Sequence, residues 1–184
     1  MHRNSIRNLL RTYLGSHPDE ADTARRVIDF VEGNSDCFDR SLDEGHITGS
    51  AWIVDSSGTN TLLTHHRKLG IWLQLGGHAD GESDVLSVAM DEAFEESGLT
   101  NLEVVCEEIF DLDVHGIPAR KNEPAHFHYD VRFLFRQTGA EDYIVSEESH
   151  DLAWVPMAEL ESYTCEWSMR RMRDKAVRIL SSKE

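Results

Sequence analysis

The sequence predicts an α/β fold in which a mixed β-sheet lies between helices. Three observations lead to this prediction. Residues 1–40 follow a helical period, residues 47–156 contain short β-rich runs on both sides of a single helix, and the chain closes on an amphipathic helix. Strands interrupted by one helix and flanked by others are typical of a sheet with helices packed against it. With 184 residues, the chain is long enough to bury a substantial core.

Residues 1–40 are predicted to form a helical hairpin. A first apolar face at helical spacing consists of Ile6, Leu9, Leu10, Tyr13 and Leu14. After the interruption at Pro18, a second such face consists of Ala21, Ala24, Val27, Ile28 and Val31, and Gly33-Asn34 ends it. We therefore expect residues 1–40 to be an extension that packs on a main domain of residues 41–184.

The main domain begins where the period changes. Residues 47–55 and 60–66 are β-rich runs joined by the turn sequence SSGT, and residues 70–77 form a third short strand. A helix is predicted from about Ser83 to Ser97. The runs 102–115 and 125–136, joined by a polar loop, and the run 151–156 are further strands. The closing helix carries Trp167, Met172, Ala176 and Ile179 on one face.

The composition of the chain limits which partners it is expected to bind and in which cellular compartment it is expected to work. The chain has 18 basic and 34 acidic residues and a formal net charge of −16, which repels nucleic acid, so we expect no nucleic-acid partner. No apolar run approaches the roughly 18–20 residues of a membrane span, and the amino terminus lacks a signal-peptide core. Three cysteines far apart argue against a disulfide framework and for a reducing cytoplasm. A homodimer is compatible with the sequence but not indicated by it.

The helix at residues 83–97 changes character along one face. Val85, Val88 and Ala89 share an arc of the helical wheel, and the same arc continues into glutamates: Glu92, Glu95 and Glu96. Carboxylates at i, i+4 repel one another by roughly 0.2–0.5 kcal/mol, and the negative end of the helix dipole adds to the cost. The run between Lys68 and Arg120 contains no Lys or Arg. A divalent cation such as Mg²⁺ or Mn²⁺ would compensate this charge; the plainer interpretation is a solvated helix end.

The glycines around this helix complete a recognisable unit. Gly76-Gly77 leads from a strand into a loop, and Gly98 stands where a helix-ending glycine belongs. From Gly77 to Leu99 the stretch resembles the Nudix box, G-x5-E-x7-R-E-U-x-E-E-x-G-U with U apolar. Residues 92–99 fit its second half completely. Its first Glu falls on Ser83, with Glu82 one residue early, and its Arg falls on Asp91.

The resemblance implies a fold, a reaction and a site. The fold is the Nudix α/β/α sandwich with a mixed sheet, covering roughly residues 45–165 and leaving the N-terminal hairpin outside. The reaction is Mg²⁺- or Mn²⁺-dependent hydrolysis of a nucleoside diphosphate linked to another moiety, so the partner is a small-molecule nucleotide substrate. Glu92, Glu95 and Glu96 would be metal ligands, Glu92 or Glu96 would also act in catalysis, and a backbone carbonyl of Gly76 or Gly77 would be a further ligand. A fourth carboxylate would come from a later loop; the candidates are Glu147 and Glu148, which no motif fixes, and the alternative for them is a solvated loop.

Weaker signals concern the substrate. His78 follows the glycine pair, and Arg120 and Lys121 in the polar loop are candidates for contacts with substrate phosphate. His126, His128 and Asp130 alternate on one strand face. This trio fits a transition-metal site or a phosphate contact; the alternative, which we favour, is a polar strand face that lines a pocket or faces water.

Two other functions remain open. Asp91 favours a non-catalytic protein whose decayed Nudix box senses a nucleotide or a metal. An isopentenyl-diphosphate isomerase of the same fold would need a cysteine with a glutamate, and Cys106 is the candidate, although it belongs to no recognisable motif.

Overall fold

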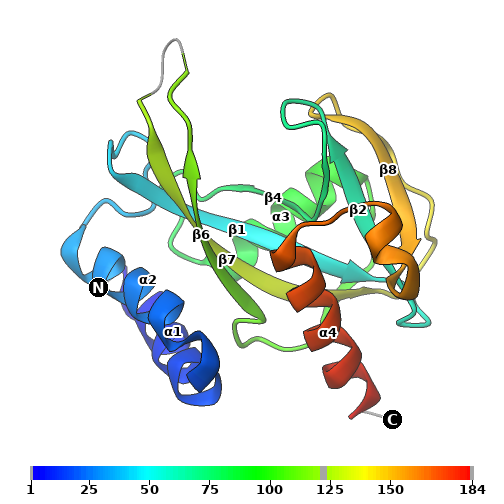
Figure 1. Ribbon diagram of the computed structural model, residues 1–184, viewed down its shortest axis with the longest axis horizontal. Coiled ribbons are helices and arrows are strands. Elements are labelled where there is room, and N and C mark those ends of the chain that lie inside the picture. The colour runs from blue at the N-terminus through cyan, green and yellow to red at the C-terminus, as the bar shows by residue number, and fades with distance from the viewer. Residues whose placement is uncertain (1, 121–123, 183–184) are drawn as a thin grey trace.

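One long strand organises the sheet of this protein. In the computed structural model, which describes residues 2–120 and 124–182, β1 (Gly45–Val54) pairs in parallel with β7 (His126–Gln137) along its whole length. The other pairings are antiparallel: β2 (Asn60–His66) and β4 (Leu75–His78) on β1, and β5 (Leu102–Val104) and β6 (Asp111–Ile117) on β7. β3 (Trp72–Leu73) and β8 (Ser149–Pro156) both pair with β2. The predicted mixed sheet is confirmed (Figure 1).

Two strands expected from the sequence are each divided in the structure. The run 70–77 changes partner at Gln74, because β3 pairs with β2 whereas β4 pairs with β1. The run 102–115 lies along one edge of β7 but has too many residues to match it. Val105 and Phe110 still donate to the carbonyls of Leu134 and Arg132, and the four residues between them loop out. A continuous apolar-rich run reveals neither a change of partner nor residues that loop out, so the sequence predicted single strands.

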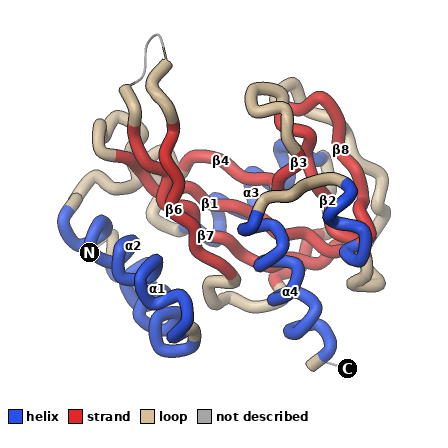
Figure 2. Tube along the Cα trace, viewed as in Figure 1, coloured by secondary structure: helices blue, strands red, loops and turns tan. Residues whose placement is uncertain are grey.

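Successive side chains of β1 point to opposite faces of the sheet, and each face packs against its own helices. Ile47, Ala51 and Ile53 belong to the cluster that includes α3 (Val85–Ser97) and the N-terminal hairpin, α1 (Asn4–Ser16) and α2 (Ala21–Gly33). Trp52 and Val54 point the other way, into the cluster that includes α4 (Trp167–Ser181). Figure 2 shows these helices around the sheet. Short 3₁₀ turns at Pro18–Glu20 and Met157–Ser162 precede α2 and α4.

The N-terminal hairpin is part of the same hydrophobic core as the sheet. Phe30 stacks on Tyr129 of β7 with ring centroids 3.7 Å apart, and Leu10, Val27 and Val31 are fully buried. The predicted helical hairpin is therefore confirmed, and it packs on the sheet beside β6 and β7 (Figure 1). No helix among residues 2–120 and 124–182 is long and apolar enough to cross a membrane.

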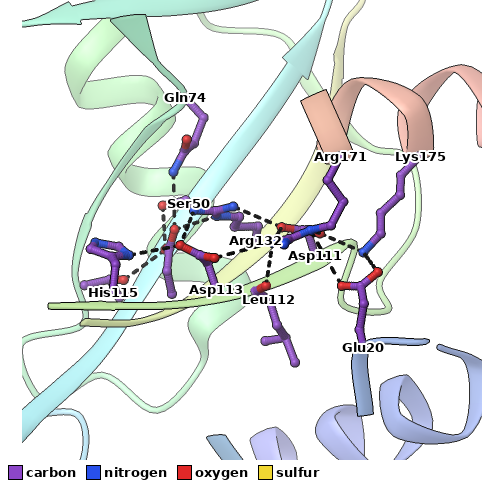
Figure 3. A network of polar contacts seen from close by, with 12 residues as sticks. Glu20, Ser50, Gln74, Asp111, Leu112, Asp113, His115, Arg132, Arg171 and Lys175 are labelled. Atoms are coloured by element: carbon purple, nitrogen blue, oxygen red, sulfur yellow. Dashed lines mark hydrogen bonds and ion pairs between the residues drawn. The ribbon is translucent and has the colours of Figure 1, made fainter. Parts of the chain in front are cut away.

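A buried ionic network joins the hairpin, the sheet and α4. Arg132 of β7 ion-pairs with Asp111, Asp113 and Asp130 at 2.6–3.4 Å, and its side chain is 3% exposed. Figure 3 shows Asp111 also held by Arg171 and Lys175 of α4. Lys175 continues to Glu20, just before α2, at 2.6 Å. Three layers of the fold are thus tied through one carboxylate, Asp111.

Candidate active site

The strand register arranges polar side chains in rows on one face of the sheet. His46, Thr48 and Ser50 alternate on the same side of β1. The parallel register places them opposite His128, Asp130 and Arg132 of β7, respectively. On β6, the next strand, His115, Asp113 and Asp111 stand opposite those three β7 residues. One row is therefore all histidine, and the rows beside it are hydrogen-bonding and ionic.

A cleft of about 320 Å³ opens over these rows. Its lining combines the Gly76-Gly77 backbone, several histidines and a few charged side chains. The lining residues most relevant to chemistry are Arg40, His46, His66, Lys68, Gln74, Gly76, Gly77, His78, His115, Arg120, His126, His128, Asp130 and Glu148. The β1–β4 pairing and the β1–β7 pairing together hold the floor of this cleft rigidly.

The acidic end of α3 lies directly against the Gly76-Gly77 backbone. The amide of Gly76 donates to Oε2 of Glu96 at 3.0 Å, and Glu96 is 7% exposed. Glu92 packs so closely on Gly77 that a Cβ at that position would overlap its carboxylate. α3 approaches β1 closely too, since a Cβ on Gly49 would be 2.9 Å from Cγ1 of Val88. Glycine at these positions therefore lets the helix bring its carboxylates to the strand.

Burial and mutual repulsion shift the titration of both carboxyls. Burial is the largest cause that raises the pKa of Glu92 to about 7, and the charges of Glu95, Glu148 and Asp80 add to it. Burial likewise raises the pKa of Glu96 to about 7; the Gly76 amide opposes the shift, and Glu92 and Glu148 reinforce it. The site thus concentrates negative charge, which Arg40 offsets only in part at Glu92.

The other predicted acidic ligands differ in position. Glu148 lines the cleft and acts electrostatically on both Glu92 and Glu96. Its neighbour Glu147 is exposed and does not line the cleft. Glu95 is exposed as well, although its charge reaches Glu92. The structure therefore brings Glu92, Glu96 and Glu148 together and leaves Glu147 outside.

Positive charge reaches the site from segments distant in sequence. Arg40, which precedes the sheet, ion-pairs with Asp80 and lowers the pKa of Glu92. Lys68 and Arg120 line the same cleft. Lys121, predicted beside Arg120, lies outside the described residues. The sequence between Lys68 and Arg120 contains no Lys or Arg that could compensate the charge of the helix. In the folded protein, Arg40, which is distant in sequence, lies close enough to lower the pKa of Glu92.

Five histidines converge at one end of the cleft. The ring centroids of His46 lie 4.9 Å from those of His78 and His128 and 5.0 Å from that of His126. His115 stands 5.5 Å from His128 and contacts Asp113 through Nδ1 at 3.2 Å. Burial is the largest cause that lowers the pKa of His46 to about 4 and that of His128 to about 2, and the neighbouring histidines add to both shifts. Both rings are neutral at physiological pH.

Asp130 is not grouped with His126 and His128 as a potential ligand. Its carboxylate accepts from Thr48 at 2.9 Å, Ser50 at 2.7 Å, Gln74 at 3.2 Å and Arg132 at 2.6 Å. These donors saturate it and fix Ser50 and Gln74 at the cleft. His126, His128 and Asp130 thus line the cleft, as the favoured interpretation expected, and the carboxylate of Asp130 belongs to the ionic network.

The two departures from the Nudix box lie away from this centre. Asp91 is exposed, and it makes no ion pair within residues 2–120 and 124–182. Glu82 accepts a hydrogen bond from the amide of Asp84 at 2.8 Å, so its carboxylate is engaged within the loop before α3. Cys106 lies in the loop between β5 and β6, contacts Glu108 and does not line the cleft. Its position removes the basis for the isomerase interpretation.

Sequence reasoning missed His46, His115, Arg40, Lys68 and Gln74. Each belongs to no motif, and each reaches the cleft only through strand pairing or a loop. The alternation of His46, Thr48 and Ser50 was visible in the sequence, but its meaning depends on the register with β7. Without that register, a polar alternation in a strand resembles any surface strand.

Comparison of the sequence with protein-family models and with curated proteins finds no match. Solved structures do match in fold. A Caenorhabditis elegans Ap4A hydrolase in a binary complex is 18% identical with a TM-score of 0.61, covering 74% of this chain and 98% of that one. The Escherichia coli dihydroneopterin triphosphate pyrophosphohydrolase is 15% identical with a TM-score of 0.53, covering 70% and 92%.

A third similar structure is a Nudix domain with a ligand. It is the domain of Shewanella oneidensis NrtR complexed with ADP-ribose, 14% identical with a TM-score of 0.51, covering 77% of this chain and 92% of that one. The matches span nearly the whole of the compared proteins, so the likeness includes the complete domain. The sandwich expected from the box is thereby confirmed: this chain has the Nudix fold.

Proposed function

We propose that this protein is a metal-dependent pyrophosphohydrolase that cleaves a nucleoside diphosphate linked to another moiety. The observation that carries the proposal is the packing of Glu92 and Glu96 on the Gly76-Gly77 backbone, with Glu148 acting electrostatically on both from the lining of the adjacent cleft. Neither the fold nor one carboxylate alone would support it. The proposal assigns the activity to residues 41–184, treats residues 1–40 as an extension, and places the protein in a reducing cytoplasm, which suits its three free cysteines.

The residues fit a hard divalent cation. Mg²⁺ and Mn²⁺ prefer carboxylate and carbonyl oxygens, and this site offers three carboxylates, two of them packed on the Gly76-Gly77 backbone. The pKa values near 7 of Glu92 and Glu96 reflect charge that burial leaves uncompensated, and a divalent cation compensates it. When bound, the metal neutralises phosphate charge and lowers the pKa of a coordinated water. Glu95, exposed at the same helix end, is an outer ligand in this proposal.

The remaining side chains fit the substrate. Arg40, Lys68 and Arg120 supply positive charge along the cleft for phosphate oxygens. His78 and His126 line the same wall and contact the moiety bound there. Glu92 or Glu96 accepts the proton of the attacking water, since a carboxyl whose pKa lies near neutrality can exchange a proton at physiological pH.

A substrate panel tests this proposal. The protein is incubated with nucleotide sugars, dinucleotides, ADP-ribose, CDP-alcohols and nucleoside triphosphates, with Mg²⁺ or Mn²⁺ or with a chelator, and the products are separated. We expect at least one diphosphate-linked compound to be split only when metal is present. Cleavage in the chelator, or cleavage of none of these classes by a folded protein, contradicts the proposal.

The second candidate is a non-catalytic sensor of a nucleotide or metal, and the specific observation in its favour is Asp91 in place of the box Arg. The same panel distinguishes it. A sensor binds one of these nucleotides, detected by a shift of the thermal melt, without turning it over. A pyrophosphohydrolase releases products from the compound that it binds.

A further inference from the structure

Three histidines from three strands meet at the wall of the cleft. His46 comes from β1, His78 from β4 and His128 from β7, and one ring nitrogen of each lies within 4.8 Å of the other two. We call these residues the three-histidine cluster. The strand register holds it in place, because His46 is paired directly with His128 while His78 is paired with Thr48, two residues along β1. The cluster is thus a product of tertiary structure that no sequence spacing reveals.

His46 supplies an independent indication of a ligand. Its side chain is 3% exposed, and neither Nδ1 nor Nε2 has a hydrogen-bond partner among the described residues. A buried polar group without a partner costs free energy. An ion held at the cluster would engage one of these nitrogens directly, which gives a physical reason for a buried imidazole at this position.

The surroundings of these rings distinguish between a phosphate and a transition metal ion as the ligand. A phosphate would need protonated, positively charged rings. His46 is buried, and its ring and that of His128 lie 4.9–5.5 Å from other imidazoles without an ion-paired carboxylate among the described residues, so the cluster offers lone pairs and disfavours added protons. Neutral imidazole nitrogens are ligands for transition metals. The carboxylate of Asp130, which could have held a protonated ring, is already taken by Arg132 and three other donors.

We propose that His46, His78 and His128 form a binding site for a divalent transition metal ion of the zinc class, with its remaining coordination position open to the cleft. A tetrahedral zinc ion bound at about 2.0–2.1 Å holds its nitrogen ligands roughly 3.3 Å apart, so each ring needs to move by about an ångström. All three histidines line the cleft, so the open position takes a water or an oxygen of a molecule bound there. His126, with Nε2 at 3.4 Å from that of His128, stands at the edge of the site.

This site is separate from the carboxylates of α3, although it shares His78 with the substrate contacts proposed above. It offers nitrogen ligands, which suit zinc, cobalt and nickel, whereas Glu92, Glu96 and Glu148 offer the oxygen ligands that suit magnesium and manganese. Gly77 lies between the two, since it contacts Glu92 and is followed by His78. Binding at one site can therefore be measured while the other is disabled.

Cobalt and zinc titrations test the proposal. Chelator-treated protein is titrated with Co²⁺, whose visible absorption reports its coordination, and Zn²⁺ is then added as a competitor. We expect about one Co²⁺ per chain with a four-coordinate spectrum that Zn²⁺ abolishes. His78→Gln and His128→Gln, at half-buried positions, should weaken Zn²⁺ binding about a hundredfold or more, since even loss of an outer-shell partner costs 10–100-fold.

Two control variants identify the site. His150→Gln removes an exposed imidazole from β8, and Glu92→Gln/Glu96→Gln disables the carboxylates; both should keep Zn²⁺ affinity within about threefold of the native protein. Circular dichroism and thermal melts confirm that each variant is folded. Zn²⁺ affinity unchanged in folded His78→Gln and His128→Gln would overturn the proposal. So would a loss of Zn²⁺ binding in the glutamine double variant while the histidine variants retain it.

Discussion

Glu92 and Glu96 lie one helical turn apart on α3, and burial and mutual repulsion raise the pKa of each to about 7. Carboxylates in this arrangement destabilise the helix when both are ionised. A structural role alone does not explain such a pair, because an apolar residue would fill the same space at lower cost. The cost of placing these two carboxylates together has a physical reason if the pair binds a cation.

The first prediction concerns pH in the absence of metal. The native pKa values near 7 lie above the ordinary value of 4.5, so between these limits the native state binds more protons than the unfolded state. The contribution of the pair to stability is therefore lost as pH rises through this window, and no further loss follows above it. With solvent screening, we expect roughly 1–3 kcal/mol in total.

The measurement is the free energy of unfolding in chelator at pH 5 and pH 8. The matched control is Glu92→Gln/Glu96→Gln, which lacks the titrating groups and keeps their volume. The native protein should lose stability relative to the control as pH rises. A difference between the two proteins that is the same at both pH values would show that these carboxyls titrate normally.

The second prediction uses two adjacent glutamates as a matched pair. Both are exposed, but Glu148 lines the cleft and acts electrostatically on Glu92 and Glu96, whereas Glu147 does not line it. Glu148→Gln should lower metal-dependent turnover about tenfold or more, since it removes a charge from the cation site. Glu147→Gln should leave turnover unchanged. If the two substitutions lowered turnover equally, the loop would not present Glu148 alone to the cleft, and the prediction would be wrong.

At the scale of elements, the site depends on how closely α3 approaches β4. Gly77 has no side chain, and the carboxylate of Glu92 occupies the space that a Cβ would take. We predict that Gly77→Ala displaces this flexible carboxylate, weakens Mn²⁺ binding about tenfold and changes the melting temperature little. Gly15→Ala, in α1 with nothing near its Cβ position, is the control and should leave Mn²⁺ affinity unchanged. Mn²⁺ affinity retained in Gly77→Ala would mean that Glu92 is not a ligand.

The elements also show what the sequence reveals and what it does not. The helix at 83–97 and the hairpin at 1–40 were predictable because a helical period and glycine stops are local signals. The unit from Gly77 to Leu99 was predictable as a motif for the same reason. The divisions between β3 and β4 and between β5 and β6 were not, because the first depends on a change of partner from β2 to β1 and the second on a loop of four residues that breaks the pairing with β7. Boundaries set by pairing partners carry no local signal.

At the scale of the whole molecule, the cleft is supported by the buried network around Asp111. Lys175 of α4 contacts Asp111 at 2.7 Å and the hydroxyl of Tyr13 in α1 at 2.6 Å, joining groups 64 and 162 residues apart. Arg132, in the same network, holds the carboxylate of Asp130 that fixes Ser50 and Gln74 at the cleft (Figure 3). Contacts over such separations cannot be predicted from one sequence. For the same reason, the sequence did not show that histidines and basic side chains from distant segments meet at the cleft.

We predict that Lys175→Met destabilises the protein by about 3 kcal/mol, because it leaves Asp111 and Glu20 with less compensating charge in a buried place. Arg178→Met is the matched control: it lies on the exposed face of the same helix and should change stability by no more than about 0.5 kcal/mol. Urea unfolding of both variants gives the comparison. Equal stabilities would show that the network is solvated and does not hold the hairpin.

Turnover by Glu96→Gln decides whether the carboxylates of α3 serve metal-dependent hydrolysis. The amide keeps the volume of the side chain and removes the charge that a hard cation needs. On the best substrate of the panel, with Mg²⁺ or Mn²⁺, we predict that folded Glu96→Gln retains less than about one hundredth of the native turnover. Turnover within about twofold of the native protein would contradict it, since the buried carboxylate would then have no part in the reaction.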